Sequence, residues 1–154
     1  MIYLKWKKKE LSRIIKSIGL YNNKSKNLIL MSKNIIKNFN GKIPNNKKDL
    51  IKLEGIGNKT ANIILSNIYN INCIAVDTHV FRVSNRLGLI NEKKILKAEK
   101  ALEVVIQKKD LIKMHYCLIN HGKKYCKARS PLCNKCFLNL HCFYYKNCIK
   151  NKNI

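Results

Sequence analysis

The sequence predicts an all-α protein, and three observations point to that fold class. Only two prolines and six glycines interrupt its 154 residues, so few positions break a helix. Apolar residues recur at intervals of three and four along most of the chain, which is the spacing of one helix face. The alternation of apolar and polar residues that marks a half-buried strand is scarce.

Residues suited to helix ends divide the first part of the chain. Residues 11–18 carry apolar side chains at helical spacing, and Gly19 is expected to end this first helix. Ser25 is expected to cap a second helix, because its side-chain oxygen can accept a hydrogen bond from a free backbone N–H group. Asn40 and Gly41 are expected to end that helix, since both tolerate the left-handed backbone found there.

The rest of the chain predicts further helices joined by short turns. Gly88 and Gly122 are expected to end two of them. A loop that contains four cysteines follows, and the polar tail from Cys148 to Ile154 is expected to fray. The expected helices cover residues 45–53, about 58–69, 77–87, 92–107 and 111–121.

The chain is strongly basic. Lysine and arginine total 32 residues against 8 aspartate and glutamate residues, which gives a net charge of +24. Such a balance favours a polyanionic partner, and nucleic acid is the usual one. A codon bias toward lysine, asparagine and isoleucine would produce part of the same excess on a solvated surface, so the charge supports DNA binding without establishing it.

Nothing in the sequence directs the protein to a membrane. No stretch approaches the roughly 18 consecutive apolar residues that a membrane-spanning helix needs. The segment from Met1 to Glu10 is basic but lacks the apolar core of a signal peptide. We therefore expect no membrane partner and a cytoplasmic, nucleoid-associated location. In that reducing compartment, the seven cysteines indicate metal ligands and buried thiols rather than a disulfide framework.

A glycine hairpin occupies residues 53–61, with the sequence Leu-Glu-Gly-Ile-Gly-Asn-Lys-Thr-Ala. Glycine permits positive φ and leaves no Cβ atom between the backbone and a ligand. The turn and the helix after it can direct several backbone N–H groups at one phosphate oxygen, and can grip a DNA backbone without reading its sequence. An ordinary glycine-rich helix connection is the alternative. The candidate DNA contacts are Gly55, Ile56, Gly57, Asn58 and Thr60.

Lys59 lies in the expected first turn of the helix that follows the hairpin. The positive end of the helix dipole disfavours another cation there, and so favours the neutral amine. A neutral amine can attack an electrophilic carbon and form a Schiff base, and C1′ of a damaged nucleoside is the natural electrophile. Lys59 is therefore a candidate catalytic nucleophile, with a plain surface lysine as the alternative.

Asp77 opens the segment Asp-Thr-His ahead of an amphipathic helix, a position that suits an N-cap. A carboxylate held there can also deprotonate a lysine, or stabilise the positive charge that builds on a deoxyribose as its base departs. The link over residues 70–76 is short enough to bring the chain back, so we expect Lys59 and Asp77 to face one cleft. His79 is a candidate phosphate contact, with a packing role as the alternative.

Four closely spaced cysteines follow, Cys126, Cys133, Cys136 and Cys142. Four thiolates can hold zinc or a [4Fe–4S] cluster, and spacing alone favours zinc as the more frequent occupant of short four-cysteine sites. Lys127 and Arg129 form a basic rim that is expected to meet a phosphate backbone, with a solvated charged loop as the alternative. Cys73 and Cys117 are expected to be buried thiols, and Cys148 a thiol of the tail.

Together these residues resemble endonuclease III, the family of base-excision DNA glycosylases with AP lyase activity. The resemblance runs from Ile15 to Cys142. Residues 53–61 resemble the helix-hairpin-helix of that family, with Lys59 at its Schiff-base lysine, and residues 75–83 resemble its catalytic aspartate segment. The cysteine spacing resembles its iron–sulfur loop, and this resemblance implies a [4Fe–4S] cluster in place of zinc.

The resemblance implies a helix-hairpin-helix glycosylase fold: a partial six-helix barrel over residues 1–108, an iron–sulfur cluster region over residues 109–147 and a tail over residues 148–154. It implies an enzyme that removes oxidised pyrimidines from double-stranded DNA and cleaves 3′ to the abasic site by β-elimination. Lys59 would displace the flipped-out base at C1′. The related adenine glycosylases lack this lysine, so Lys59 favours the bifunctional branch over a monofunctional adenine-glycosylase-like enzyme.

The chain departs from the family by lacking its N-terminal segment, which supplies the first helices of the barrel and part of the base pocket. Without that segment, apolar faces of the remaining helices would be exposed. A true start upstream, a separate chain that forms the other half of a split enzyme, and a catalytically impaired DNA-binding remnant are the alternatives. We expect a monomer unless such a separate chain exists.

Overall fold

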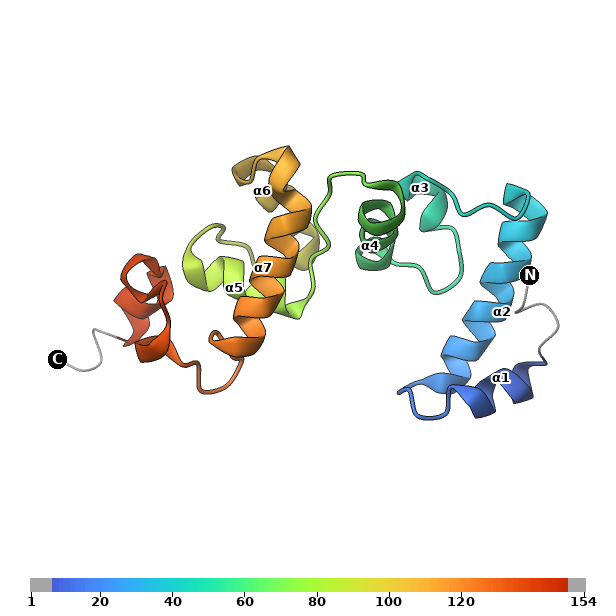
Figure 1. The fold of residues 1–154 in the computed structure, drawn as a ribbon, viewed down its shortest axis with the longest axis horizontal. Helices are drawn as coiled ribbons and strands as arrows, with labels where there is room; N and C mark the ends of the chain where they lie inside the picture. The colour runs from blue at the N-terminus through green and yellow to red at the C-terminus, as the bar shows by residue number, and fades with distance from the viewer. Residues whose placement is uncertain (1–6, 150–154) are drawn as a thin grey trace. The chain divides into compact units, whose positions relative to one another are not determined.

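The computed structural model of the protein describes residues 7–149, and these residues form helices and no β-strand, which confirms the predicted all-α class (Figure 1). Residues 1–6 and 150–154 lie outside the described residues, and with them most of the tail that we expected to fray. Along the described part of the chain, every helix is too short or too polar to cross a membrane.

The chain forms two compact units, Met1–Ala61 and Asn62–Ile154. Helix α4 (Asn58–Tyr69) begins in the first unit and ends in the second. The predicted division into a partial barrel over residues 1–108, a cluster region over residues 109–147 and a tail over residues 148–154 stays a prediction.

In the first unit, α1 (Lys8–Ile14) packs against α2 (Tyr21–Phe39), as Figure 1 shows. The hydroxyl oxygens of Ser12 and Ser25 lie 2.6 Å apart across this contact. Ser25 uses its one hydroxyl proton on the carbonyl of Asn22, at 3.0 Å, so Ser12 is the donor between the two. Ser25 is fully buried and joins the two helices.

The predicted starting point of the second helix is therefore wrong. Ser25 lies one turn inside α2, which begins at Tyr21 after Leu20, a residue with left-handed backbone (φ 60°). The first helix also ends earlier than predicted, at Ile14. The predicted end of α2 is confirmed: Asn40 has a φ of 52°, and the N–H of Gly41 donates to the carbonyl of Ile35 at 3.1 Å.

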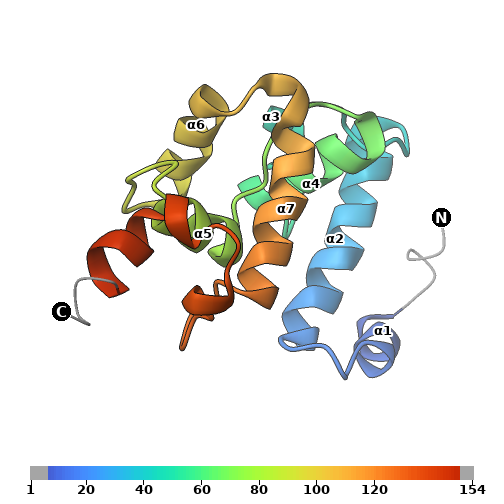
Figure 2. The ribbon, with the colours of Figure 1, turned by 60° about the vertical axis from the view of Figure 1, so that its left-hand side comes forward.

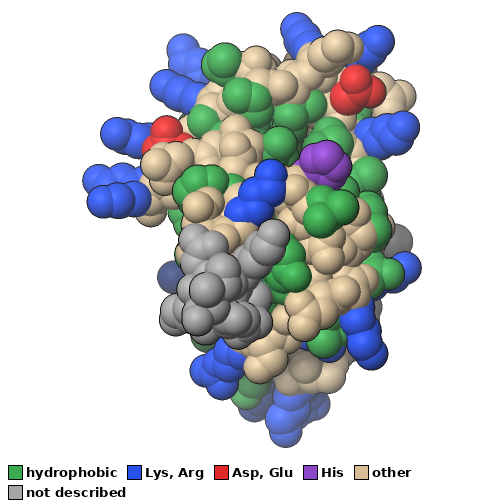
Figure 3. All heavy atoms as spheres, turned by 90° about the vertical axis from the view of Figure 1, so that its left-hand side faces the viewer, with side chains coloured by type: hydrophobic (Ala, Val, Ile, Leu, Met, Phe, Trp, Pro, Cys, Tyr) green, Lys and Arg blue, Asp and Glu red, His purple; other side chains and the backbone are tan. Residues whose placement is uncertain are grey.

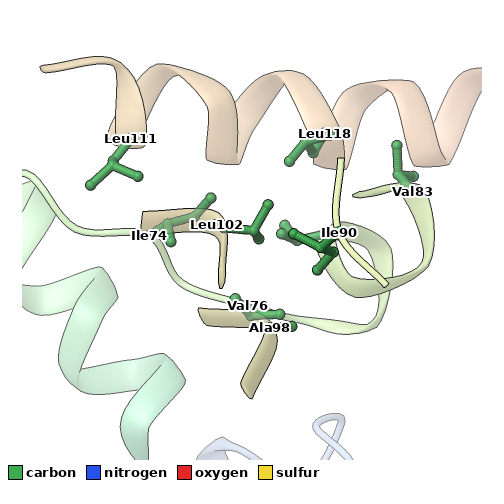
Figure 4. Close-up of a cluster of buried hydrophobic side chains, with 9 residues drawn as sticks. Ile74, Val76, Val83, Ile90, Ala98, Leu102, Leu111 and Leu118 are labelled. Atoms are coloured by element: carbon green, nitrogen blue, oxygen red, sulfur yellow. The ribbon is translucent and has the colours of Figure 1, made fainter. Parts of the chain in front are cut away.

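The second unit is built from the end of α4 and three further helices, α5 (Thr78–Leu87), α6 (Ile95–Val105) and α7 (Leu111–Lys124). Helix α5 packs along α7 (Figure 2). Buried apolar side chains from these helices and from the loops between them form one cluster (Figure 4), and their removal from water is the main stabilising term of this unit. The cluster comprises Ile74, Val76, Val80, Val83, Ile90, Ala98, Leu102, Leu111 and Leu118.

Helix α7 runs through Gly122, where the sequence predicts its end. A Cβ atom at Gly122 would lie 3.0 Å from Cγ2 of Val83 and 3.3 Å from Cβ of His79, both on α5. The missing side chain therefore lets α5 and α7 approach closely. Gly122 is therefore a packing residue, and its prediction as a helix terminator is wrong. The local sequence does not show that α5 lies against this position.

Short helical turns carry the chain beyond α7. They are Cys133–Lys135, Asn139–His141 and Tyr145–Ile149. The last of these contains Cys148, which the sequence assigned to the tail. Cys117 is exposed on α7, so its predicted burial is wrong. Cys73 is half-buried, and its thiol donates to the carbonyl of Asn62 at 3.4 Å.

Candidate functional site

The glycine hairpin joins α3 (Lys47–Leu50) to α4. Gly55 has left-handed backbone (φ 81°), and a Cβ atom there would lie 3.0 Å from Nδ2 of Asn27 in α2. The N–H of Ile56 donates to the carbonyl of Leu53 at 3.1 Å and closes the turn. The turn geometry and the neighbouring helix thus both require a glycine at position 55.

Gly57 differs from Gly55, because nothing in the described part of the chain requires a glycine there. Its φ lies outside the left-handed region, and a Cβ atom would have no heavy atom within 4 Å. Its carbonyl accepts a hydrogen bond from the N–H of Ala61 at 2.9 Å, which leads directly into α4. Gly57 is exposed, so the space beside this backbone is open to a group from outside the protein.

Lys59 lies in the first turn of α4 with an exposed side chain, the position that the sequence predicts. The hairpin therefore presents its backbone and this lysine at one end of the helix. The predicted DNA contacts in the hairpin occupy one continuous turn before and beside Lys59: Gly55, Ile56, Gly57, Asn58 and Thr60.

Helix α3 supports the hairpin through a network around Asp49. Asn46 caps α3 by accepting from the N–H of Asp49, at 2.9 Å, and its Nδ2 donates back to the Asp49 carboxylate at the same distance. Lys52 donates to the other carboxylate oxygen at 2.6 Å. Hydrogen bonds from Lys52 and then from Asn46 lower the pKa of Asp49. Leu50 and Leu53, in the same segment, are buried and anchor it in the first unit.

Asp77 is the N-cap of α5, as the sequence predicts. One carboxylate oxygen accepts from the N–H groups of His79 and Val80, both at 2.8 Å. The second oxygen lies 3.6 Å from Nδ1 of His79, and the Asp77 side chain is only 15% exposed. Two backbone bonds hold the carboxylate in a fixed position at the N-terminus of α5.

Two buried polar side chains hold the segment that leads to Asp77. The carbonyl of Ile74 accepts from Nδ2 of Asn62 at 2.8 Å, and the carbonyl of Ala75 lies 2.8 Å from Nδ1 of His115. A carbonyl only accepts, so Nδ1 of His115 carries the proton. Neither Asn62 nor His115 is among the predicted site residues, because no local signal separates them from other polar residues on helix faces.

The four predicted metal ligands lie together around one hollow of the second unit, whose empty volume, including the part open to solvent, is about 320 Å³. Half-buried or buried thiols are the donor type that zinc and iron–sulfur centres use. The side chains that line the hollow are Cys126, Cys133, Cys136, Cys142, Leu87, His121, Tyr125, Asn139, Tyr144 and Tyr145.

The thiols stand around the hollow rather than meeting at one point. Among residues 7–149, no three His, Cys, Asp or Glu side chains are grouped so that they could hold a metal ion. Burial and then the charges of the other three cysteines raise the pKa of Cys133, while Arg86 opposes this shift. Burial also lowers the pKa of His121, whose Nε2 lies 3.6 Å from Sγ of Cys136.

Two arginines of α5 hold the loop that begins at Cys126, and neither is among the predicted site residues. Arg82 donates to the Cys126 carbonyl through Nε at 3.1 Å and Nη2 at 2.9 Å. Arg86 donates to the carbonyls of Lys127 at 2.7 Å and Ala128 at 3.1 Å. Their four-residue spacing, which places them on one helix face, is the signal that the sequence offered.

The predicted residues fall in both units of the chain. Lys59 belongs to the first unit, whereas Asp77, His79 and the cysteines belong to the second. Lys127 and Arg129 are exposed, as a basic rim requires. Lysine and arginine side chains project around the face drawn in Figure 3, where acidic side chains are few. The DNA contacts of all these residues stay predictions.

Comparison with known proteins identifies the family. Residues 2–108 match the HhH-GPD superfamily of base excision DNA repair proteins. The match contains the hairpin, Lys59 and Asp77. Because it covers more than half of the chain, the protein belongs to this superfamily.

Similar proteins carry the name endonuclease III. The one from Rickettsia prowazekii (strain Madrid E) is 48% identical over 137 residues, which cover 89% of this chain and 65% of the relative. The one from Bacillus subtilis (strain 168) is 46% identical over 135 residues, which cover 87% of this chain and 62% of the relative. The predicted resemblance is confirmed, and the chain spans less than two thirds of the length of these two relatives.

Solved structures give the same result for the fold. A trapped endonuclease III–DNA covalent intermediate is 40% identical with a TM-score of 0.89, and covers 94% of this chain and 68% of its own. A thermostable thymine-DNA glycosylase is 26% identical with a TM-score of 0.85, and covers 95% of this chain and 69% of its own. These likenesses confirm the predicted helix-hairpin-helix glycosylase fold.

Proposed function

We propose that the protein is a base-excision DNA glycosylase with AP lyase activity, which removes oxidised pyrimidines from double-stranded DNA. The observation that carries the proposal is the exposed Lys59, the second residue of α4, which follows the open backbone of Gly57 by two positions. The structure of a trapped endonuclease III–DNA covalent intermediate, at a TM-score of 0.89, supports covalent chemistry for this fold.

Lys59 acts as the nucleophile in this proposal. Its neutral amine attacks C1′ of the damaged nucleotide, and the electron pair of the glycosidic bond leaves with the base, which takes up a proton. The amine nitrogen loses its protons as the sugar ring opens to the Schiff base. Removal of a proton from C2′ then expels the 3′ phosphate, so the strand is cleaved 3′ to the abasic site by β-elimination.

Asp77 supplies the carboxylate of the reaction. Its two bonds to backbone N–H groups hold one oxygen in place, and the second oxygen is not used by the cap. A fixed negative charge can stabilise the positive charge that builds on the deoxyribose, or accept a proton from the lysine. The cap and the catalytic role are compatible because they use different oxygens.

We infer that Cys126, Cys133, Cys136 and Cys142 hold a [4Fe–4S] cluster. Four thiols around one hollow fit this group, because each thiolate of a four-iron cluster bonds a different iron and the sulfurs therefore stand apart. When bound, the cluster ties the chain beyond α7 into one unit. Lys127 and Arg129, on the exposed rim of that loop, are placed to meet a phosphate backbone.

DNA binding begins at the hairpin. The open space beside Gly57 and the first turn of α4 suits a phosphate oxygen, and His79 offers a second contact beside Asp77. Such contacts hold the backbone of a duplex without reading its sequence. We infer a monomer that works on damaged or abasic double-stranded DNA in the cytoplasm, at the nucleoid.

Borohydride trapping on a duplex with one abasic site tests the proposal. Wild-type protein is expected to form a covalent adduct, and Lys59→Ala to form none while it still binds the duplex. Lys48→Ala, which removes an exposed lysine from α3, is the matched control and should trap like the wild type.

The other outcomes decide between the alternatives. Folded wild-type protein that binds DNA but never traps would contradict the lyase proposal and leave a DNA-binding remnant or one half of a split enzyme. Release of the base without strand cleavage would favour a monofunctional glycosylase.

A further inference from the structure

Arg86 lies at the centre of a group of contacts beside the cysteine hollow. Its guanidinium stacks over the ring of Tyr144, 4.7 Å from the ring centroid. The same guanidinium donates to the carbonyls of Lys127 and Ala128, at 2.7 Å and 3.1 Å. A planar group that is held by a ring and two carbonyls has little freedom to turn.

Arg86 also contacts two of the four cysteines. Its Nη1 donates to Sγ of Cys126 at 3.6 Å, and the thiol of Cys142 donates to the backbone carbonyl of Arg86 at 3.2 Å. The first bond is strengthened when Cys126 is a thiolate, because donor and acceptor are then both charged. The second bond requires Cys142 to keep its proton, so it ends when Cys142 becomes a metal ligand.

We propose that Arg86 is a positioning residue of the cysteine centre. Its guanidinium holds Cys126 at the hollow in the iron-free protein, and Nη1 donates to the Cys126 sulfur once that sulfur is a ligand. Cys142 is held by the backbone carbonyl of the same residue. The second half of this proposal rests on the proposed cluster. Hydrogen bonds to ligand sulfurs tune the reduction potential of an iron–sulfur centre, and a cationic donor stabilises the more negative, reduced state.

Arg82 is a matched control for Arg86, four residues earlier on the same helix. Within the described residues, its guanidinium bonds only to carbonyl oxygens, those of Cys126, Gly122 and Thr78. It therefore holds the same loop without a bond to sulfur. A purely structural role would make the two arginines equivalent, whereas a role toward the sulfur would separate them.

The first experiment compares wild type, Arg86→Lys and Arg82→Lys as full-length proteins loaded with iron and sulfide. Lysine keeps the charge but cannot span two carbonyls and a sulfur as a guanidinium does. We expect Arg86→Lys to shift the reduction potential to more negative values, and Arg82→Lys to leave it unchanged. Equal potentials in wild type and Arg86→Lys would overturn the role toward the sulfur.

The second experiment uses the iron-free proteins, so that it does not depend on the cluster. Alkylation rates of individual cysteines are mapped by mass spectrometry, with the half-buried Cys73 as internal reference. We expect Arg86→Lys to raise the rate at Cys126 several-fold, because its sulfur loses the guanidinium donor. The rate at Cys142, whose thiol bonds the backbone carbonyl of residue 86, and the rate at Cys73 should stay unchanged. An unchanged rate at Cys126 would overturn the positioning role. In the first experiment, a wild-type protein that takes up no iron would overturn the proposed cofactor instead.

Discussion

Asn27 of α2 lies against the backbone of Gly55, a residue with left-handed backbone (φ 81°). A Cβ atom at Gly55 would stand 3.0 Å from Nδ2 and 3.1 Å from Cβ of Asn27, tighter than nine in ten Cβ contacts in proteins, so Asn27 would have to give way. Glu54, the preceding residue, accepts a hydrogen bond from Asn34 of the same helix at 3.4 Å. Helix α2 thus holds one side of the hairpin in place.

Replacing Gly55 by alanine is therefore expected to destabilise the protein. The left-handed backbone and the contact with Asn27 together predict a loss of about 1–3 kcal/mol in the free energy of unfolding. Gly41→Ala is the control, because Gly41 also has a positive φ (74°) but a Cβ atom there would meet nothing within 4 Å. Urea denaturation should give a larger loss for Gly55→Ala, and equal losses would contradict the role of Asn27.

Gly57→Ala, in contrast, should leave the stability of the protein unchanged and weaken its binding to DNA. A Cβ atom at position 57 would meet no heavy atom within 4 Å. We expect the free energy of unfolding to stay within about 0.5 kcal/mol of the wild type. If a phosphate occupies the space beside Gly57, the added methyl group displaces it, and affinity for a duplex should fall on the order of tenfold, or roughly 1.4 kcal/mol. Fluorescence anisotropy with an abasic-analogue duplex, at one fixed salt concentration, measures this change.

The comparison of the two glycines gives each variant its control. Unchanged affinity in a fully folded Gly57→Ala protein would contradict a phosphate contact at the hairpin. A loss of stability in that variant would mean that position 57 serves the fold, as position 55 does.

Features that depend on neighbours in sequence were predictable. The helix over residues 58–69, the cap at Asp77 and the end of α5 at Gly88 are all found in the structure, because each depends on side chains within one or two turns. The start of α2 was predicted at Ser25 from the same kind of signal. That prediction failed because a contact with Ser12, from another helix, takes the serine into the interior.

Features that depend on residues far apart in sequence were not predictable. Arg82 and Arg86 reach a loop about forty positions away, and His115 reaches Ala75 across a similar separation. The local spacing places Arg82 and Arg86 on one helix face, but it does not show which loop that face contacts. Gly122 is the clearest case, since its local sequence indicates a helix end, whereas α5 lies against it and the helix continues.

Gly122→Ala is expected to destabilise the second unit although alanine is the better helix former. Helix propensity alone would favour alanine by about 1 kcal/mol. The added Cβ atom, however, would stand 3.0 Å from Cγ2 of Val83 and 3.2 Å from Nη2 of Arg82, so these side chains of α5 must give way by a few tenths of an ångström. We expect a net loss of about 1–3 kcal/mol in the free energy of unfolding.

Thermal unfolding of Gly122→Ala beside Gly19→Ala separates the two effects. A Cβ atom at Gly19 would meet nothing within 4 Å, so Gly19→Ala should be close to neutral. A Gly122→Ala protein more stable than the wild type would show that propensity outweighs packing, and would contradict the close approach of α5 and α7.

Asp77 allows its two proposed roles to be separated by substitution. Asparagine caps helices as well as aspartate does, so Asp77→Asn should keep the bonds to the N–H groups of His79 and Val80. It removes the negative charge, and we expect it to abolish release of an oxidised pyrimidine from a duplex in single-turnover assays. Asp77→Ala removes both roles, and should also lower the free energy of unfolding by about 0.5–2 kcal/mol. If a folded Asp77→Asn protein released the base at the rate of the wild type, Asp77 would serve α5 alone.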